Sequence, residues 1–417
     1  MILEKYSIGI GDRFGHQGAA QLQALQKADE RGVQIVPVWN KSFREHTIVG
    51  TKPGDTRAAA DAAVKERSWK YAYYVDADHI GLKNVDLFLD SSNFYTLDVA
   101  DFIGKPAEEN QIESFVKSMR QYTKTFPLAG VRTTTAVTEA DLYTIGRKYL
   151  YAVKEAGRIY RHIAENKGAD NFVAEVSTDE ANEPQTPAQL FFILAALAEE
   201  GVRVQTIAPK FTGSFLKGID YVGSVEKFTT EFEEDVLVIG HAIKTFDLPN
   251  NLKLSVHSGS DKFSLYPPIR RTIQKHNAGL HLKTAGTTWL EELIGLAAAG
   301  GDGLKVAQEI YATAFSRIDE LCKPYETVID IDRSKLPDPA TVRSWGSDDF
   351  ASALRHNQSD PRYNLHFRQL LHVGYKVAAE MGEKYLQMLV KNREIIGRNV
   401  AENLFDRHIR PLFLDSN

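Results

Sequence analysis

The chain has 417 residues, of which 43% are hydrophobic and 25% are charged. These proportions exclude a disordered or fibrous chain, because they are typical of a globular protein that buries a large core. The 50 basic and 55 acidic residues give a net charge of −5, so no overall field favours nucleic acid or an anionic membrane. A local basic pocket for a small anion stays compatible with this charge.

The sequence carries no signal of export or of membrane insertion. The single cysteine, Cys322, excludes an intramolecular disulfide framework and a four-cysteine zinc site. Glu4 and Asp12 lie where a signal peptide needs an uninterrupted apolar core. The most apolar run, 190–197, is too short to span a bilayer. We therefore expect a cytoplasmic protein without a membrane partner.

Eight short apolar runs are predicted to be β-strands. They are rich in β-branched and aromatic residues, and their hydrophobicity is nearly continuous, as is typical of strands buried on both faces of a parallel sheet. The runs lie at 6–11, 33–39, 71–77, 94–99, 172–177, 203–208, 252–257 and 279–284.

Amphipathic segments separate most of these runs and predict helices. The segments 21–32 and 186–201 each end on a glycine, a common helix stop, and 138–166 has the periodicity of one long helix. Strands that alternate with helices predict a parallel sheet in an α/β protein. A count of eight favours a closed (β/α)8 barrel of the TIM type over an open, doubly wound sheet.

After about residue 287 the strand pattern stops and the remaining chain is helical. We interpret residues 1–300 as a catalytic barrel, with 289–300 as its last helix, and residues 301–417 as a helical C-terminal extension packed on it. The stretch 323–347, which contains three prolines, is the best candidate for a linker. The glycines at 9, 11 and 15 lack the spacing of a dinucleotide-binding fingerprint, so the sequence does not support a nicotinamide cofactor.

Three histidines occur at predicted strand ends, where barrel enzymes carry their chemistry. His79, His257 and His281 belong to three separate strands, and a closed barrel would let them converge. Imidazoles are ligands that zinc or manganese accepts, and Glu175 or Asp76 could complete the set. For each histidine alone, a hydrogen-bonded residue near the barrel mouth is the favoured interpretation, but the three together favour a divalent metal cation.

Polar residues beside these histidines are candidates for proton transfer and for anion binding. Asp78 and Asp261 lie close in sequence to predicted ligands, so they are candidate acid–base groups. Alternatively, Asp78 caps a turn, and Asp261 pairs with Lys262 or with a helix N-terminus. Lys283 and Thr287 come just before a predicted helix, where the chain could bind a carboxylate or phosphate, or could simply cap the helix.

Four segments of the predicted barrel are long and distinctive. They are GDRFGHQG (11–18), YYVDADHIGL (73–82), VHSGSDKFSLYP (256–267) and HLKTAGTTWLEEL (281–293). They resemble the tagaturonate epimerases of bacterial hexuronate catabolism. The resemblance implies a metal-dependent isomerase that interconverts D-tagaturonate and D-fructuronate. It also implies that His79, His257 and His281 bind the metal, with Asp78 and Asp261 as proton acceptor and donor.

The chemistry of this reaction favours one route. The two uronates differ at a carbinol carbon β to the ketone, so enolisation would invert the wrong centre. Retro-aldol cleavage and re-addition avoid this problem, with a metal that stabilises the enediolate, two acid–base groups and an anchor for the carboxylate. The candidate substrate contacts are Arg13, Glu175, Lys262, Lys283 and Thr287. A transient oxidation would need a hydride carrier, for which the sequence shows no site.

Two other interpretations stay open. The chain could be another metal-dependent barrel isomerase or aldolase that acts on a keto sugar acid, or a non-catalytic carbohydrate-binding barrel. The expected partner of the enzyme is a small anionic sugar acid, whereas a non-catalytic barrel would bind a sugar without turnover. The C-terminal helices could cover the barrel or form the interface of a homo-oligomer.

Overall fold

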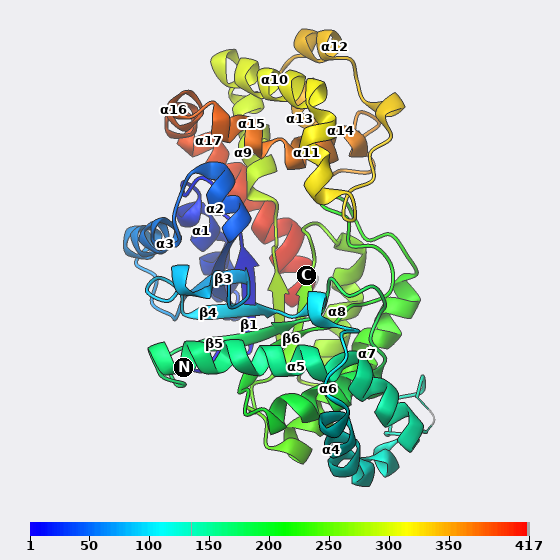
Figure 1. Ribbon diagram of the computed structural model, residues 1–417. Coiled ribbons are helices and arrows are strands. Elements are labelled where there is room, and N and C mark those ends of the chain that lie inside the picture. Colours follow the sequence, from blue (N-terminus) through cyan, green and yellow to red (C-terminus); the bar gives the residue numbers. More distant parts are fainter. Residues whose placement is uncertain (135, 415–417) are drawn as a thin grey trace.

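Eight parallel strands close into a barrel in the computed structural model, which describes residues 1–134 and 136–414 (Figure 1). Each strand pairs with the next, and the last pairs with the first through Tyr6↔Leu280 and Ser7↔His281. The predicted (β/α)8 barrel is therefore confirmed, and an open sheet is excluded. The strands are β1 (Tyr6–Ile10), β2 (Val36–Ser42), β3 (Tyr74–Ile80), β4 (Phe94–Asp98), β5 (Val173–Ser177), β6 (Val204–Ala208), β7 (Lys253–His257) and β8 (Leu280–Lys283).

Two strands lie three residues further along the chain than predicted. β2 covers 36–42 instead of 33–39, and β3 covers 74–80 instead of 71–77. β2 begins where its neighbour supplies a partner, with Val36 opposite Ser7. Both strands then continue into polar residues that find partners within the protein, such as Asp76 with Lys283 and Lys41 with Thr51. A prediction from apolar residues alone therefore places the ends of these two strands too early in the sequence.

Helices surround the barrel in chain order. The three predicted helices are present, with each end within three residues of its predicted position. α6 starts at a capping box between Thr186 and Gln189, with Pro187 in its first turn. The barrel layer comprises α1 (Gly18–Asp29), α2 (Phe43–Val49), α3 (Pro53–Arg67), α4 (Glu109–Met119), α5 (Glu139–Lys167), α6 (Pro187–Glu199), α7 (Val225–Phe246) and α8 (Tyr266–Lys275), with 3-10 turns η1 (Val85–Leu87), η2 (Ala100–Phe102), η3 (Arg120–Thr125) and η4 (Phe263–Leu265).

The rest of the described chain is helical and lies mainly beyond one end of the barrel (Figure 1). The elements are α9 (Thr288–Ala299), α10 (Gly301–Ser316), α11 (Ile318–Cys322), η5 (Lys323–Tyr325), η6 (Arg333–Lys335), α12 (Pro339–Ser344), α13 (Ser347–Leu354), α14 (Leu365–Val373), α15 (Tyr375–Glu380), α16 (Glu383–Lys391), α17 (Arg393–Glu402), η7 (Asn403–Ile409) and α18 (Arg410–Phe413). Within 1–134 and 136–414, no helix has the length and apolar character needed to cross a membrane.

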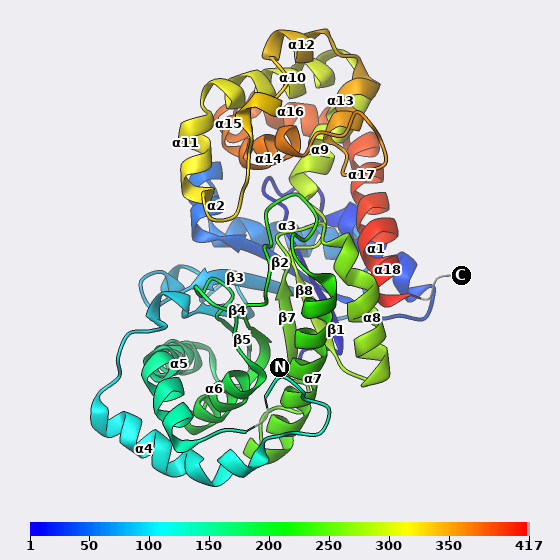
Figure 2. The same ribbon diagram turned by 90° about the vertical axis from the view of Figure 1, so that its right-hand side faces the viewer.

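Two hydrophobic cores divide these elements in an unexpected way. α9 packs against α10, α13 and α17, and its apolar residues belong to the core of the extension. Residues 404–414 instead join the barrel core, where η7 contacts α1 and α18 contacts α8 (Figure 2). Residues 404–414 thus cover the part of the barrel that 289–300 was predicted to cover as the last barrel helix. The domain limits 1–300 and 301–417 stay a prediction.

The predicted linker 323–347 is not a free connection. It contains η5, η6 and α12, and the side chains of Tyr325 and Val342 are buried in the core of the extension. The segment packs as part of the extension, and its residues 325–328 reach the mouth of the barrel.

Candidate active site

A cavity of about 860 Å³ lies at the C-terminal ends of the strands. The end of every strand, or the loop that follows it, contributes to the lining, from Gly11 after β1 to Thr287 after β8. Tyr325, Val328 and His372 come from the extension. The cavity therefore occupies the place where barrel enzymes bind their substrates, and the extension forms part of its wall.

A bulge at the end of β3 brings two adjacent side chains to this cavity. The pairing of β3 with β4 jumps from Ala77↔Tyr95 to Ile80↔Leu97, so one extra residue is inserted. His79 has a φ of 53°, which is unusual for any residue except glycine. On a regular strand Asp78 and His79 would point to opposite faces, but both line the cavity. Such local strain is frequent at functional sites.

His79, Asp179 and His257 form a cluster that could hold a metal ion. One ligand atom from each lies within 4.8 Å of the others, which makes this a candidate metal group among the described residues. The two imidazole rings are 5.4 Å apart between centroids, and Asp179 Oδ2 is 3.1 Å from His257 Nδ1. The three residues come from the ends of β3, β5 and β7, so the barrel closure brings them together.

The hydrogen bonds of the two imidazoles fit a metal site. His257 Nε2 is 2.8 Å from Glu175 Oε1, and His79 Nδ1 is 3.3 Å from Asp98 Oδ2. His257 Nδ1 is buried, and Asp179 Oδ2 lies 3.1 Å from it as an ion-pair partner. A histidine that binds a metal characteristically has its second ring nitrogen held by a carboxylate. The residues present therefore fit a divalent cation.

The charge of the cluster also favours a cation. Burial alone would lower the pKa of His257, but Asp179 and Glu175 outweigh it and raise the pKa to about 10. Asp78 and Asp98 likewise raise the pKa of His79 to about 9 against the effect of burial. The same negative charges that favour protonated imidazoles also favour a metal cation, which would replace the protons on the ring nitrogens.

Lys283 organises the acidic groups at the base of the cavity. Its Nζ is 2.8 Å from Asp78 Oδ1, 2.9 Å from Asp76 Oδ2 and 3.3 Å from Glu175 Oε1. Burial opposes the charge of Lys283, but these carboxylates raise its pKa well above the usual value. In return, Lys283 lowers the pKa of Asp78 against burial, while burial raises the pKa of Asp76. Asp78 is thus held as an ionised base at the cavity wall.

A glycine on the neighbouring strand makes room for this lysine. A Cβ at Gly9 of β1 would come within 3.0 Å of the Cα of Lys283 and of the backbone nitrogen of Thr284. The missing side chain lets the end of β8 approach β1 closely, and Lys283 then points into the barrel.

Six of the ten predicted site residues line the cavity, and four do not. The six are Arg13, Asp78, His79, His257, Lys283 and Thr287. The other four are buried outside its lining: Glu175, Asp261, Lys262 and His281. Of these four, Glu175 still takes part in the site, because it supports His257 and Lys283 from below.

His281 lies deeper in the barrel than the other two histidines. It belongs to the same inward face of β8 as Lys283, two residues earlier in the strand. Its Nδ1 is 2.9 Å from Ser7 Oγ, and its ring is 5.3 Å from that of Phe94. Burial lowers its pKa to about 3. The structure does not place it in the cluster with His79 and His257, so its role as a ligand stays a prediction.

Asp261 joins the barrel to the extension. Its Oδ2 accepts hydrogen bonds from Arg368 Nη2 at 2.6 Å and from His356 Nδ1 at 3.1 Å, and its Oδ1 is 3.2 Å from His408 Nε2. Despite complete burial, Arg368 and the two histidines lower its pKa well below the usual value. The alternative pairing of Asp261 with Lys262 is therefore wrong, because the cation that contacts this carboxylate is Arg368. A proton-donor role gains no support from this placement.

Lys262 and Thr287 have different environments. Lys262 Nζ donates three hydrogen bonds of 2.7 to 2.9 Å to backbone carbonyl groups, those of Leu216, Ile219 and Ser260. Lys262 therefore connects the loops after β6 and β7, and its side chain does not line the cavity. Thr287 precedes α9 without capping it through its side chain, and its Oγ1 is buried with no partner. The start of α9 thus stays available to an anion.

Several site residues escaped the sequence analysis. Asp179 lies two residues beyond β5, where the same positional rule would have found it. Lys41 and Glu45 were missed because β2 was predicted to end at residue 39. Lys217 and His372 carry no local signal, since distant loops bring them to the cavity.

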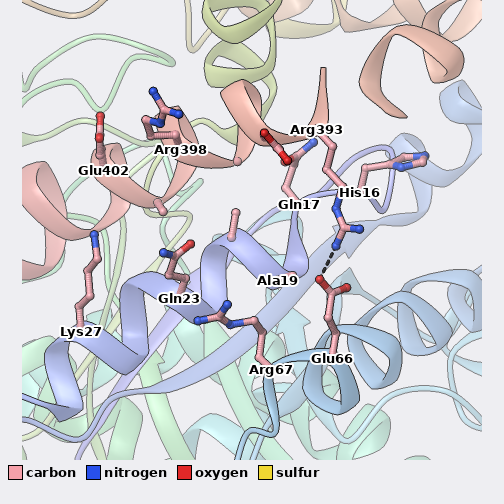
Figure 3. A pocket seen from close by; sticks show the side chains of 14 residues that line it. His16, Gln17, Ala19, Gln23, Lys27, Glu66, Arg67, Arg393, Arg398 and Glu402 are labelled. Carbon is pink, nitrogen blue, oxygen red and sulfur yellow. Dashed lines mark hydrogen bonds and ion pairs between the residues drawn. The ribbon is translucent and has the colours of Figure 1, made fainter. Parts of the chain in front are cut away.

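A second hollow, of about 570 Å³, lies outside the barrel between α1, α3 and α17 (Figure 3). Its charged side chains are of both signs, and Arg393 of α17 forms an ion pair with Glu66 of α3. No predicted site residue and no strand residue lines it, so we do not interpret it as the active site.

Comparisons with known proteins agree with this arrangement. A family model described as tagaturonate epimerase matches residues 1–412. The chain is 26% identical to a tagaturonate/fructuronate epimerase of Thermotoga maritima over 97% of this chain and 80% of that protein. Two crystal structures of a fructuronate-tagaturonate epimerase from Cohnella laeviribosi, one with glycerol and one native, show the same fold. Their TM-scores are 0.80 and 0.77, at 24% identity, with 99% of this chain and 82% of that chain covered. The chain therefore belongs to the tagaturonate epimerase family and is an epimerase.

Proposed function

We propose that the enzyme interconverts D-tagaturonate and D-fructuronate and that it depends on a divalent cation held by His79, Asp179 and His257. The substrate pair is that of the relative from Thermotoga maritima. The observation that carries the metal dependence is the convergence of two carboxylate-supported imidazoles and one carboxylate at the cavity. Such mixed nitrogen and oxygen ligands suit zinc or manganese.

Asp78 is the residue that we assign to proton transfer. When bound, the cation would act as a Lewis acid towards substrate oxygens. Asp78, ionised beside Lys283, takes the proton from the hydroxyl group at the carbon to be inverted. The carbon–carbon bond towards the ketone then breaks and leaves an aldehyde and an enediolate. The aldehyde turns, the same bond re-forms on its other face, and the new alkoxide takes up a proton.

The test follows tagaturonate by NMR in D2O. We expect fructuronate to form, to stop forming after chelation confirmed by metal analysis, and to form again after addition of manganese or zinc. Retro-aldol cleavage keeps the original hydrogen on the inverted carbon, because the aldehyde C–H bond is never broken. The matched variant Asp78→Asn should lower kcat by about 10²- to 10⁴-fold.

Three outcomes would contradict parts of this proposal. Loss of tagaturonate without fructuronate would identify another isomerase or an aldolase. Full activity after complete removal of metal would exclude the cation. Deuterium on the inverted carbon would exclude the retro-aldol route in favour of direct proton abstraction.

A further inference from the structure

Most cations of the cavity are already engaged with protein groups. Lys283 contacts the carboxylates of Asp76, Asp78 and Glu175. Lys41 Nζ donates to Arg13 O and Thr51 Oγ1, each at 2.7 Å, and Lys210 Nζ donates to Asp179 O at 3.3 Å. These groups stabilise the cavity, and they leave little capacity for an anionic ligand.

Lys217 is an exception. It follows β6, lines the cavity and is only partly exposed, yet its ammonium group has no hydrogen-bond or ion-pair partner within the part of the chain that the structure describes. Burial lowers the pKa of Lys217. A cation that is partly withdrawn from water without a protein partner costs stability, so the ammonium group of Lys217 is available to an anion that binds in the cavity.

The extension fixes the position of this lysine through its backbone. The N–H of Lys217 donates to Val328 O at 2.8 Å, and Gln369 Nε2 donates to Lys217 O at 3.3 Å. Arg368 donates through Nε to the carbonyl of the next residue, Gly218. Lys217 is thus held over the cavity by three groups of the extension, although it belongs to the barrel chain.

Two more donors lie near it. His372 of α14 lines the cavity, is 5% exposed and has a buried Nδ1 without a partner. Its ring would lie 3.4 Å from a Cβ placed on Gly218. After burial, Arg13 and Lys217 are the main causes that lower the pKa of His372, so the three groups are within electrostatic range of one another. Arg13 is held by Glu45 Oε1 at 2.9 Å and stacks on Tyr375.

We propose that Lys217, with His372 and Arg13, forms the subsite that binds the carboxylate of the substrate. The inference rests on the proposed function and adds the recognition of the acid group. Lys217 supplies the charge that no protein group neutralises, Arg13 supplies further donors beside its ion pair with Glu45, and an imidazole N–H supplies another donor to the carboxylate oxygens. The metal cluster comes from β3, β5 and β7 or the loops after them, so different residues would bind the acid end and the hydroxyketone end of the sugar.

This placement has a consequence for retro-aldol chemistry. Cleavage leaves the carboxylate on the aldehyde fragment, because the ketone is at the other end of the chain. A bound carboxylate would keep this fragment in the cavity while its aldehyde group turns.

The test compares the substrate with a neutral ketohexose in which CH2OH replaces the carboxylate. For Lys217→Met we expect the KM for tagaturonate to rise by about 10- to 100-fold, as for loss of one hydrogen bond to a charged group, with a smaller change in kcat. Lys217→Arg should restore most of this loss. The KM or competitive inhibition constant of the neutral ketohexose should change by less than about threefold.

The outcomes separate the two proposals. A wild-type enzyme that does not interconvert the uronates refutes the proposed function. If wild type turns over the acid, but Lys217→Met changes the acid and the neutral sugar equally or changes neither, the carboxylate subsite is wrong. An acid-specific rise in KM for Thr287→Val, with none for Lys217→Met, would move the anion site to the start of α9.

Discussion

The environment of Asp261 gives this carboxylate a positioning role. Both carboxylate oxygens of Asp261 contact side chains of residues 301–417. Asp261 is not among the residues that line the cavity. Removing one partner of a buried ion pair costs about 3–5 kcal/mol, because the other charge is left uncompensated. Loss of a proton-transfer group, in contrast, lowers kcat by about 10²- to 10⁴-fold without a matching loss of stability.

We expect Asp261→Asn to lower the free energy of unfolding by about 3–5 kcal/mol and to lower kcat by less than about tenfold at a temperature where the variant is folded. Urea unfolding and steady-state kinetics measure the two effects. Arg368→Met is the matched variant, and the double variant should lose less stability than the sum of the two single losses. A native stability with a 10²-fold lower kcat would instead restore the role of proton donor.

The sequence could show which site residues lie near the ends of strands, but not how deep in the barrel each side chain lies. Asp78 and His257 are at the cavity because they lie at strand ends, and the same rule selected His281. Two residues along a strand span about 6.6 Å, so His281 on the same face as Lys283 lies in a lower layer. His79 reaches the cavity only through a bulge, which the residue pattern did not reveal.

At the scale of elements, the end of the chain completes the barrel wall. η7 and α18 place Leu404, Ile409 and Leu412 in the barrel core, between α1 and α8. Helical periodicity predicted a helix in 289–300 and a helical chain after it, but it shows only which face of a helix is apolar. It contains no information about what that face packs against. The sequence therefore could not show that α9 packs in the extension while the end of the chain packs on the barrel.

Ile409→Ala tests whether this segment supports the barrel. Ile409 is fully buried in the barrel core, so its truncation should lower the free energy of unfolding by about 2–5 kcal/mol. Val390→Ala in α16 is the control, because 61% of Val390 is exposed and the change should stay within about 0.5 kcal/mol. Chemical denaturation measures both. Equal small effects would mean that the barrel is stable without the chain end.

At the scale of the whole molecule, the active site depends on contacts between the barrel and the extension. The chain leaves the barrel at α9 and returns at η7, and the buried group of Asp261, His356, Arg368 and His408 joins the two parts again. The sequence predicted both parts, but not that the extension holds Lys217 and His372 at the cavity. Such contacts join residues more than 100 positions apart, and no local pattern records them.

A metal held by residues from three parts of the barrel should stabilise the whole fold. The rise in melting temperature on metal binding can then identify the ligands, because a variant that lacks a ligand should lose this rise. A metal that binds only the folded state at 1,000 times its Kd adds about 4.1 kcal/mol of stability. We expect manganese or zinc to raise the Tm of the metal-free wild type. Asp179→Asn should abolish most of this rise because it replaces the charged carboxylate of the cluster with a weaker, neutral amide ligand. His281→Gln should keep the rise, measured against its own metal-free Tm, because His281 contacts Ser7 in a lower layer. If His281→Gln loses the rise and Asp179→Asn keeps it, the third ligand is the histidine that the resemblance implies.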